Sequence, residues 1–358
     1  MTKTFHHLSH IDLDGYSCQL VMAQTPHTMI SYNANYGAEV MDRLEEIIES
    51  LKKNKQEATI LITDLNLYPE EAKWLNNEVN RLNDNGWNVT ITLLDHHGSG
   101  RETAAQYPWY YLDTERCATK ITYDYACEHY GLERGGWLEA FVAVVNAVDL
   151  WKQNEEADFE YGKVCMRLIS EARELSRVMF GDEDRAYKLA LLEQAAQMRD
   201  LPNAPIVLDE ALHKMKKEFF KDGVDNTLDN LSTKYIVALL GTKRSVMTIY
   251  YKGWRGFLSY GLGNTSIIGN GFLTEYPDYD FIVDVGTRGT MSLRGHNRVD
   301  VAQMAGEWVG GGGHPNAAGG RIQGFKEQFR YDKVKRQMED MLANKEAMPG
   351  KLPHKIEE

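Results

Sequence analysis

The chain has 358 residues, of which 43% are hydrophobic and 26% charged, so it can bury a sizeable core and is not expected to be disordered. Its 40 Lys and Arg residues against 52 Asp and Glu residues give a net charge of −12, which disfavours binding of long nucleic acids by bulk charge. Its longest apolar run is far shorter than the about 20 residues that span a bilayer, and its N-terminus lacks a signal-peptide pattern. Four cysteines without a Cys-x-x-Cys pair are typical of a reducing compartment. We therefore expect a cytoplasmic protein with no membrane partner.

The first part of the chain alternates predicted strands with predicted helices. Strands are expected over residues 4–11, 28–33, 58–63 and 88–94. Helices are expected over residues 15–23, 39–53 and 69–82. This alternation is typical of an α/β fold with a mostly parallel, doubly wound sheet that is covered on both faces.

The middle of the chain is predicted to be helical and the C-terminal part to return to an α/β pattern. Residues 116–231 read as helices broken near 131–136, 181 and 202–205, with a long charged helix over 208–231. Strands are expected over 235–240, 245–250, 281–285 and 290–294, and helices over 301–309 and 326–342. The pattern predicts a first domain over 1–200, a helical connector over 201–233, a smaller α/β domain over 234–345, and a polar tail over 346–358.

Acidic and histidine side chains gather where the predicted strands and apolar runs of the first domain end. They are His10, Asp12, Asp14, Asp64, Asp95, His96, His97 and Asp149. In an open parallel sheet, ligands bind beyond the carboxyl ends of the strands, so we expect these groups to converge there. Carboxylates with added imidazole suit divalent metals, and two such ions can activate a water and neutralise a phosphoryl group.

Each of these residues also has an ordinary structural interpretation. Asp14 could be only a helix N-cap, and Asp64 could cap the helix that begins near Pro69. Taken together, the carboxylates would repel each other and several would be protonated at neutral pH. A charge-balancing pair of cations is the simpler account of the set.

A glycine-rich run at 310–320 is the second conspicuous motif. Its bare N–H groups could form an anion nest, extended by the positive end of a helix that starts after Pro315. His314 and Arg294 could bind a phosphate beside it. The alternative is a helix C-cap followed by a flexible linker. The spacing fits neither a Rossmann nor a Walker A motif.

These motifs together resemble the DHH phosphoesterase superfamily over residues 5–325. Asp95-His96-His97 and the run from His10 to Gly15 resemble its catalytic domain, and residues 311–319 resemble the signature of its C-terminal DHHA1 domain. Among the branches of the superfamily, the chain is most similar to the NrnB-like oligoribonucleases (nanoRNases).

The resemblance implies two divalent metal ions, Mn²⁺ first and Mg²⁺ or Co²⁺ as alternatives, in a cleft between the domains. It implies that His10 and Asp12 bind one ion, that Asp14, His96 and Asp149 bind the other, and that Asp64 bridges them. It also implies that Asp95 orients the histidines and that His97 lies beside the substrate phosphate. The implied phosphate-binding residues of the second domain are Arg294, Gly312, Gly313 and His314. His10 lies closer to Asp12 than is usual in the family, so His7 is an alternative ligand.

The function implied is an exonuclease-like hydrolase that cleaves short single-stranded oligoribonucleotides to mononucleotides, with a water between the two metals as the nucleophile. A phosphatase or phosphodiesterase acting on 3′-phosphoadenosine 5′-phosphate or on linear or cyclic dinucleotides is an alternative. A non-catalytic nucleotide-binding regulator is an alternative of another class. A homodimer is compatible with the sequence. Trp254, Tyr260 and Tyr276 are candidate base-stacking residues.

Overall fold

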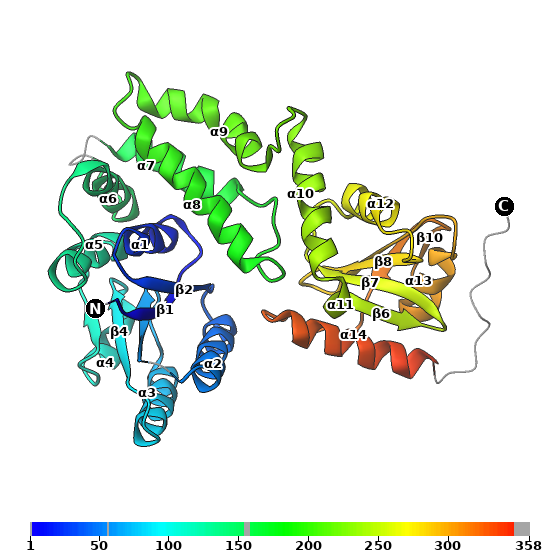
Figure 1. Cartoon of the computed structure of the whole chain (residues 1–358), viewed down its shortest axis with the longest axis horizontal. Coiled ribbons are helices and arrows are strands. Elements are labelled where there is room, and N and C mark those ends of the chain that lie inside the picture. The colour runs from blue at the N-terminus through cyan, green and yellow to red at the C-terminus, as the bar shows by residue number, and fades with distance from the viewer. Residues whose placement is uncertain (1, 56, 154–157, 347–358) are drawn as a thin grey trace. The chain divides into compact units, whose positions relative to one another are not determined.

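The computed structural model describes residues 2–55, 57–153 and 158–346, and it divides into two compact units (Figure 1). Unit 1 comprises Met1–Ala172 and Arg185–Met215, and unit 2 comprises Arg173–Asp184 and Lys216–Glu358. The predicted tail beyond residue 346 lies outside the described residues. In the part of the chain that the structure describes, no helix is long and apolar enough to cross a membrane.

Unit 1 is built on a five-stranded parallel sheet with the strand order β2-β1-β3-β4-β5. The strands are β1 (Thr4–Ser9), β2 (Thr28–Asn33), β3 (Ala58–Thr63), β4 (Val89–Asp95) and β5 (Tyr110–Leu112). All six residues of β3 are buried, as expected for a central strand with helices on both faces. The strand order reverses between β1 and β3, and this switch point is where ligands bind in open α/β sheets.

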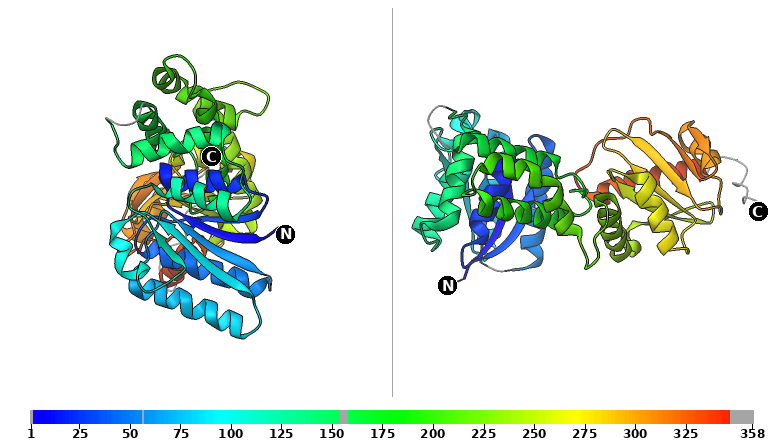
Figure 2. Two further views of the ribbon diagram at one scale, coloured as in Figure 1. Left: turned by 90° about the vertical axis from the view of Figure 1, so that its left-hand side faces the viewer. Right: turned by 90° about the horizontal axis from the view of Figure 1, so that it is seen from above.

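Helices cover both faces of this sheet (Figures 1 and 2). One face carries α2 (Ala38–Lys53) and α3 (Pro69–Asp84), and the other carries α1 (Leu13–Ala23) and α5 (Ala118–His129), on which α6 (Gly136–Asp149) packs. The remaining helices that begin before residue 221 are the short 3-10 turn η1 (Gly98–Gly100), α4 (Arg101–Ala104), α7 (Phe159–Glu171), α8 (Gly181–Met198) and α9 (Ala204–Phe220). The apolar residues of α2 are buried at helical spacing against the sheet; they include Val40, Leu44, Ile47 and Leu51. This one-sided burial explains why the periodicity of the sequence predicted a helix here.

Unit 2 holds a mixed six-stranded sheet with the order β10-β11-β9-β8-β7-β6. The strands are β6 (Thr248–Tyr251), β7 (Trp254–Tyr260), β8 (Phe281–Val285), β9 (Thr290–Gly295), β10 (Gly312–His314) and β11 (Ala317–Arg321). Its helices are α10 (Leu228–Thr242), α11 (Arg244–Met247), α12 (Thr265–Glu275), α13 (Val301–Val309) and α14 (Tyr331–Glu346). The ring of Phe272 in α12 packs on Phe257, and the ring of Trp308 in α13 packs on Phe281, so the two helices cover opposite faces.

Three predictions about the second half of the chain were wrong. The strand expected over 235–240 is part of α10, where Ile236, Val237 and Leu240 are buried at helical spacing. The helix expected over 208–231 is two helices, because Gly223 takes a left-handed φ of 74° after α9 and Thr227 caps α10. The strand expected over 245–250 begins only at Thr248, after α11. A short apolar run does not by itself distinguish a buried strand from a buried helix.

Candidate metal centre

The strand register of unit 1 aligns the predicted site residues in a row. Ser9 pairs with Thr63, and Thr63 with Leu94, so the next residues along the three strands are His10, Asp64 and Asp95. Because the strands are parallel, these residues leave the sheet at the same edge. The convergence that the sequence predicted therefore follows directly from the pairing of β1, β3 and β4.

The turn from β1 into α1 positions His10 and Asp12. Asp12 is the N-cap of α1, and its carboxylate accepts a 3.0 Å hydrogen bond from the N–H of Gly15. Gly15 is needed here because a Cβ on it would lie 2.3 Å from the carbonyl oxygen of His10. A larger residue would push α1 away from the strand and displace Asp12 with it.

Asp14 is not the cap of its own helix but is held by another one. It is buried, and its two carboxylate oxygens accept hydrogen bonds of 2.8 Å each from the N–H groups of Ala118 and Thr119. These groups belong to the first turn of α5, where the positive end of the helix dipole favours a carboxylate. The position of Asp14 is therefore determined by α5, more than 100 residues away in sequence.

Asp64 lies at the centre of the cluster in a strained backbone conformation. Its φ is 57°, a left-handed value that costs a non-glycine residue roughly 1–3 kcal/mol. The alternative that Asp64 caps the following helix is wrong, because the N-cap of α3 is Tyr68, whose N–H donates to Glu71 at 2.8 Å. The left-handed turn directs the chain away from β3 and leaves the carboxylate among the site residues.

His96 and His97 follow β4 and face different partners. The Nε2 atom of His96 lies 3.4 Å from Asp64, 3.6 Å from Asp14 and 3.6 Å from Asp149. The Nδ1 atom of His97 lies 2.7 Å from Asp95. Asp95 is fully buried, and the hydroxyl of Tyr110 donates to its other oxygen at 2.7 Å. Asp95 therefore orients His97, while His96 contacts the three carboxylates.

Asp149 reaches the site from a helix. It is the last residue of α6, within the part of the chain that was predicted to be helical. Its apolar neighbours Val144, Val145 and Val148 are buried in the packing of that helix. The apolar run before Asp149 is therefore the packed side of a helix, which fixes the place of the carboxylate at its end.

The site residues form three groups of metal-ligand type. One group is His10, Asp12 and Asp64, a second is Asp64, His96 and His97, and a third is Asp14, Cys117 and Asp149; within each, one donor atom per residue lies within 4.8 Å of the others. Asp64 belongs to two of them. Cys117 was absent from the predicted set, and it is buried at the N-terminus of α5.

The charges in this cluster are out of balance. Burial raises the pKa of Asp64 well above its usual range, and the nearby Asp14 and Asp12 carboxylates raise it further. Burial, with a contribution from Asp14, raises the pKa of Asp149 to about 8. Burial opposes the charged form of His10, yet its contacts with Asp12 and Asp64 raise its pKa to about 10. The cluster thus favours added positive charge.

The donor atoms fit divalent cations. The Oδ2 atoms of Asp64 and Asp149 are buried and accept no hydrogen bond, which is costly for a carboxylate. Carboxylate oxygens with imidazole nitrogens are ligands suited to Mn²⁺ and related ions.

His7, the alternative to His10, does not join the cluster. Its Nε2 atom is 2.9 Å from the hydroxyl of Thr63, and the residue is fully buried.

Two neighbouring residues of the β2–α2 loop were missed by the sequence analysis. The hydroxyl of Tyr36 lies 2.9 Å from Nε2 of His97, and its ring centroid is 4.6 Å from that of His10. The Oδ1 atom of Asn35 lies 3.3 Å from Nε2 of His10. Their place just after β2, at the same edge as the other strand ends, was the one signal that could have found them.

The predicted phosphate-binding residues of unit 2 gather on one part of its sheet. Antiparallel pairing aligns His314 with Ala317, and Ala317 with Arg294. Directly paired residues face the same side, so Arg294 and His314 share a face about 10 Å apart across two strand spacings. The Nη2 atom of Arg294 donates to Ser266 in α12 at 2.7 Å.

The glycine-rich run has a different structure from the predicted one. No helix starts after Pro315, because residues 312–314 and 317–321 form the β10–β11 hairpin. Gly310 caps α13 in a left-handed conformation with φ 66°, as the alternative interpretation expected, but a strand follows it and not a linker. A Cβ on Gly313 would lie 2.5 Å from the carbonyl oxygen of Ala317, whereas one on Gly312 would meet nothing within 4 Å. Close backbone packing therefore explains Gly313, and Gly312 stays open to solvent.

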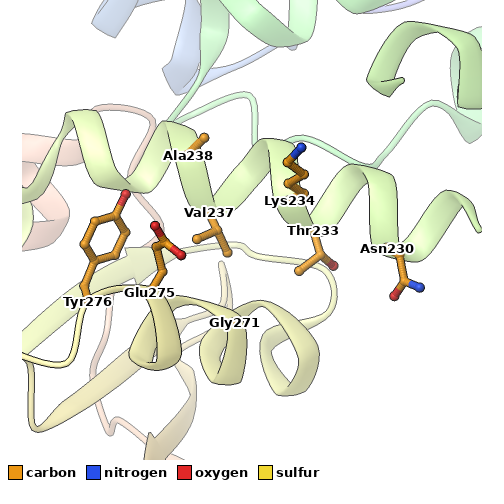
Figure 3. Close-up of a pocket in the computed structure, with 8 residues that line it drawn as sticks. All are labelled: Asn230, Thr233, Lys234, Val237, Ala238, Gly271, Glu275 and Tyr276. Carbon is orange, nitrogen blue, oxygen red and sulfur yellow. The ribbon is translucent and has the colours of Figure 1, made fainter. Parts of the chain in front are cut away.

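Unit 2 also has a groove between α10 and α12, with a volume of about 370 Å³ (Figure 3). Val237 points from α10 toward Gly271 of α12, and Tyr276 lies at the end of α12. Among the described residues that line it, Lys234 and Glu275 are the charged ones. Of the candidate stacking residues, Tyr276 lines this groove, and Tyr260 is fully buried and thus unavailable for stacking.

Similar proteins are known for nearly the whole chain. A 3′,5′-cyclic-nucleotide phosphodiesterase from Helicobacter pylori (strain ATCC 700392 / 26695) is 44% identical over 344 residues, which cover 95% of this chain and 99% of the relative. The chain belongs to the family of this phosphodiesterase. The oligoribonuclease NrnB of Bacillus subtilis (strain 168) is 24% identical over 349 residues, 92% of this chain and 77% of that protein. Both names suggest the DHH-type phosphoesterases that the motifs resemble.

A solved structure shares the fold of the chain over nearly its whole length. The crystal structure of an uncharacterized protein from Helicobacter pylori G27 has a TM-score of 0.91 and 44% sequence identity, and the match covers 96% of this chain and 100% of that one. No protein-family model matches the chain. The similarity to the phosphodiesterase and to the oligoribonuclease supports a hydrolase that acts on phosphodiesters.

Proposed function

We propose that the protein is a divalent-metal-dependent phosphodiesterase of the DHH type. The observation that carries this proposal is the meeting of histidines and carboxylates at the switch point of the parallel sheet, with buried carboxylate oxygens that lack a hydrogen bond. The names of the two relatives support the same reaction class.

We assign His10 and Asp12 to one metal ion and Asp14, His96 and Asp149 to the other, with Asp64 shared. The short distances from His10 to Asp12 (3.0 Å) and Asp64 (3.5 Å), and from His96 to the other acids, support this division. When bound, two such ions, with Mn²⁺ as the first candidate, would neutralise phosphate charge and lower the pKa of a water molecule.

Asp95 and Tyr36 hold His97 in one orientation and determine which of its ring nitrogens carries the proton. Because Asp95 accepts from Nδ1 of His97, the proton of the neutral ring resides on Nδ1 and Nε2 is left as an acceptor. The hydroxyl of Tyr36 then donates to Nε2 and holds the ring in place. His97 is assigned to stabilise charge on the phosphate or to protonate the leaving oxygen, as the sequence analysis expected.

Two substrate classes fit the site, and we order them by the similarity of the chain to its two relatives. The stronger similarity, at 44% identity, is to a 3′,5′-cyclic-nucleotide phosphodiesterase, so we place cyclic nucleotides first. Short oligoribonucleotides, which the sequence analysis placed first, come second on the weaker similarity to an oligoribonuclease. In either case we assign Arg294, Gly312, Gly313 and His314 to the phosphate or the nucleotide.

The test is a product time course with purified full-length protein and added Mn²⁺. The substrates are 3′,5′-cyclic nucleotides, labelled oligoribonucleotides of two to twenty units, a cyclic dinucleotide and 3′-phosphoadenosine 5′-phosphate. We expect Mn²⁺-dependent hydrolysis of a phosphodiester, inhibited by EDTA, with cyclic nucleotides cleaved fastest. Tight nucleotide binding without hydrolysis of any of these would instead establish the regulatory alternative.

A further inference from the structure

A cavity opens beside the metal-ligand carboxylates of unit 1, with a volume of about 160 Å³. On one side it is bounded by Asp12, Asp14 and Asp149. Its other walls are mostly apolar and come from the start of α1, the end of α6 and one face of α7. They are formed by Ile11, Leu13, Val148, Met166, Ile169 and Ser170.

The wall contributed by α7 is positioned by a glycine. Gly162 packs against α6 so closely that a Cβ on it would lie 2.6 Å from Cβ of Val148. Met166, Ile169 and Ser170 follow Gly162 by four, seven and eight residues, so they lie on the same face of α7. The close approach of α7 to α6 therefore brings this stripe of side chains next to Asp149.

The cavity combines a fixed floor with an adaptable entrance. Leu13, Val148 and Ile169 are 5%, 1% and 3% exposed, so their side chains are held by the core. Met166 is 41% exposed, and its flexible thioether can adjust to a flat ring and make favourable sulfur–aromatic contacts. A rigid apolar floor with a methionine at the entrance suits an aromatic ligand.

We propose that this cavity binds the nucleobase of the substrate nucleotide. The inference rests on the proposed function, which places the phosphate at the neighbouring carboxylates through bound cations. The base is the apolar, aromatic part of a nucleotide, whereas the ribose carries hydroxyls and the phosphate carries charge. A carboxylate rim disfavours an anion inside the cavity itself. Met166 and Ile169 are then residues that decide the preference for a nucleotide over a base-free sugar phosphate.

The experiment measures equilibrium binding to the Mn²⁺-loaded full-length protein by calorimetry. The probes are adenosine 5′-monophosphate and ribose 5-phosphate, which share the sugar phosphate and differ in the base. We expect the wild type to bind the nucleotide at least tenfold more tightly. The Met166→Ala variant, which removes a wall, and the Ser170→Trp variant, which fills the entrance, should each reduce that ratio about tenfold. Both positions are exposed, so the thermal unfolding midpoint should not change.

The matched control is Ile206→Ala, which truncates an aliphatic side chain of α9 that is 60% exposed and does not line this cavity. It should keep the wild-type ratio. Equal affinity of the wild type for the two probes would overturn the proposal, and so would an unchanged ratio in both cavity variants. A protein that selects the nucleotide but hydrolyses no phosphodiester would keep the cavity assignment and overturn the proposed function. A protein that hydrolyses phosphodiesters but does not select the nucleotide would keep the proposed function and overturn the cavity assignment.

Discussion

The two conspicuous motifs of this chain, the strand-end acids of unit 1 and the glycine hairpin of unit 2, stand out for different physical reasons. In unit 1, Asp64 keeps a left-handed backbone and a buried carboxylate oxygen without a hydrogen bond, both of which cost free energy. In unit 2, Gly313 relieves a clash with the backbone of Ala317, so its presence lowers the free energy of the fold. A residue that destabilises the fold points to function more strongly than a residue that the packing of the fold already requires.

The largest effect that separates the two regions is expected at Asp64. The Asp64→Asn variant should reduce Mn²⁺-dependent hydrolysis by at least about 1000-fold, because it removes the carboxylate shared by the two proposed ions. In EDTA its free energy of unfolding should not fall, since burial and the neighbouring acids already disfavour the ionised form of Asp64 and the amide is neutral. Mn²⁺ should raise the thermal midpoint of the wild type but not of the variant.

The control for this prediction is Asp200→Asn, because the side chain of Asp200 is 87% exposed. It should keep both activity and the stabilisation by Mn²⁺. Wild-type turnover in Asp64→Asn would remove Asp64 from the site.

His97 should affect the rate more than metal binding. Because its Nδ1 atom is engaged by Asp95, we expect His97→Ala to lower kcat by about 10²–10⁴ while Mn²⁺ affinity is largely kept. His96→Ala is the matched comparison and should lose Mn²⁺ affinity, since His96 faces three carboxylates. Isothermal titration with Mn²⁺ and steady-state kinetics check both. An equal loss of Mn²⁺ affinity in the two variants would make His97 a ligand, as its place in one of the ligand groups allows.

In unit 2 the prediction concerns stability. Gly313→Ala should lower the free energy of unfolding by about 1–3 kcal/mol, because its Cβ would lie 2.5 Å from a carbonyl oxygen. Gly312→Ala, where the same atom meets nothing within 4 Å, should cost much less. Denaturant unfolding measures the difference. Equal stability of the two variants would show that packing does not explain Gly313. A raised KM in Gly312→Ala would indicate that Gly312 contacts the phosphate of the substrate.

The smallest effect is expected at Tyr36. Tyr36→Phe removes a hydroxyl that lies 2.9 Å from His97 but keeps the ring beside His10. One hydrogen bond of this kind contributes about 1 kcal/mol, so kcat should fall up to about tenfold with KM nearly unchanged. The reference variant is Tyr250→Phe, at a tyrosine that is 63% exposed on β6, and it should keep the wild-type kcat. A change in KM alone would mean that Tyr36 binds substrate and does not position His97.

Much of the site was predictable because it depends on short-range order. The strands β1, β3 and β4 each lead into polar residues of the site, and parallel pairing brings the ends of these strands together whatever the intervening helices do. His10, Asp64 and Asp95 could therefore be grouped from sequence. The helix–strand assignment of residues 235–240 failed because a short apolar run is compatible with a buried helix as well as with a strand.

The amino-acid sequence by itself determined the α/β character of the chain, most strands of the parallel sheet, and the set of acids and histidines at their ends, because hydrophobic periodicity and residue chemistry are local properties. Only the tertiary structure decided that α5 holds Asp14, that the end of α6 brings Asp149 close to His96, that Tyr36 meets His97, and that Gly313 of the hairpin serves backbone packing. These are contacts between residues distant along the chain, and they exist only after the helices have packed on the sheets.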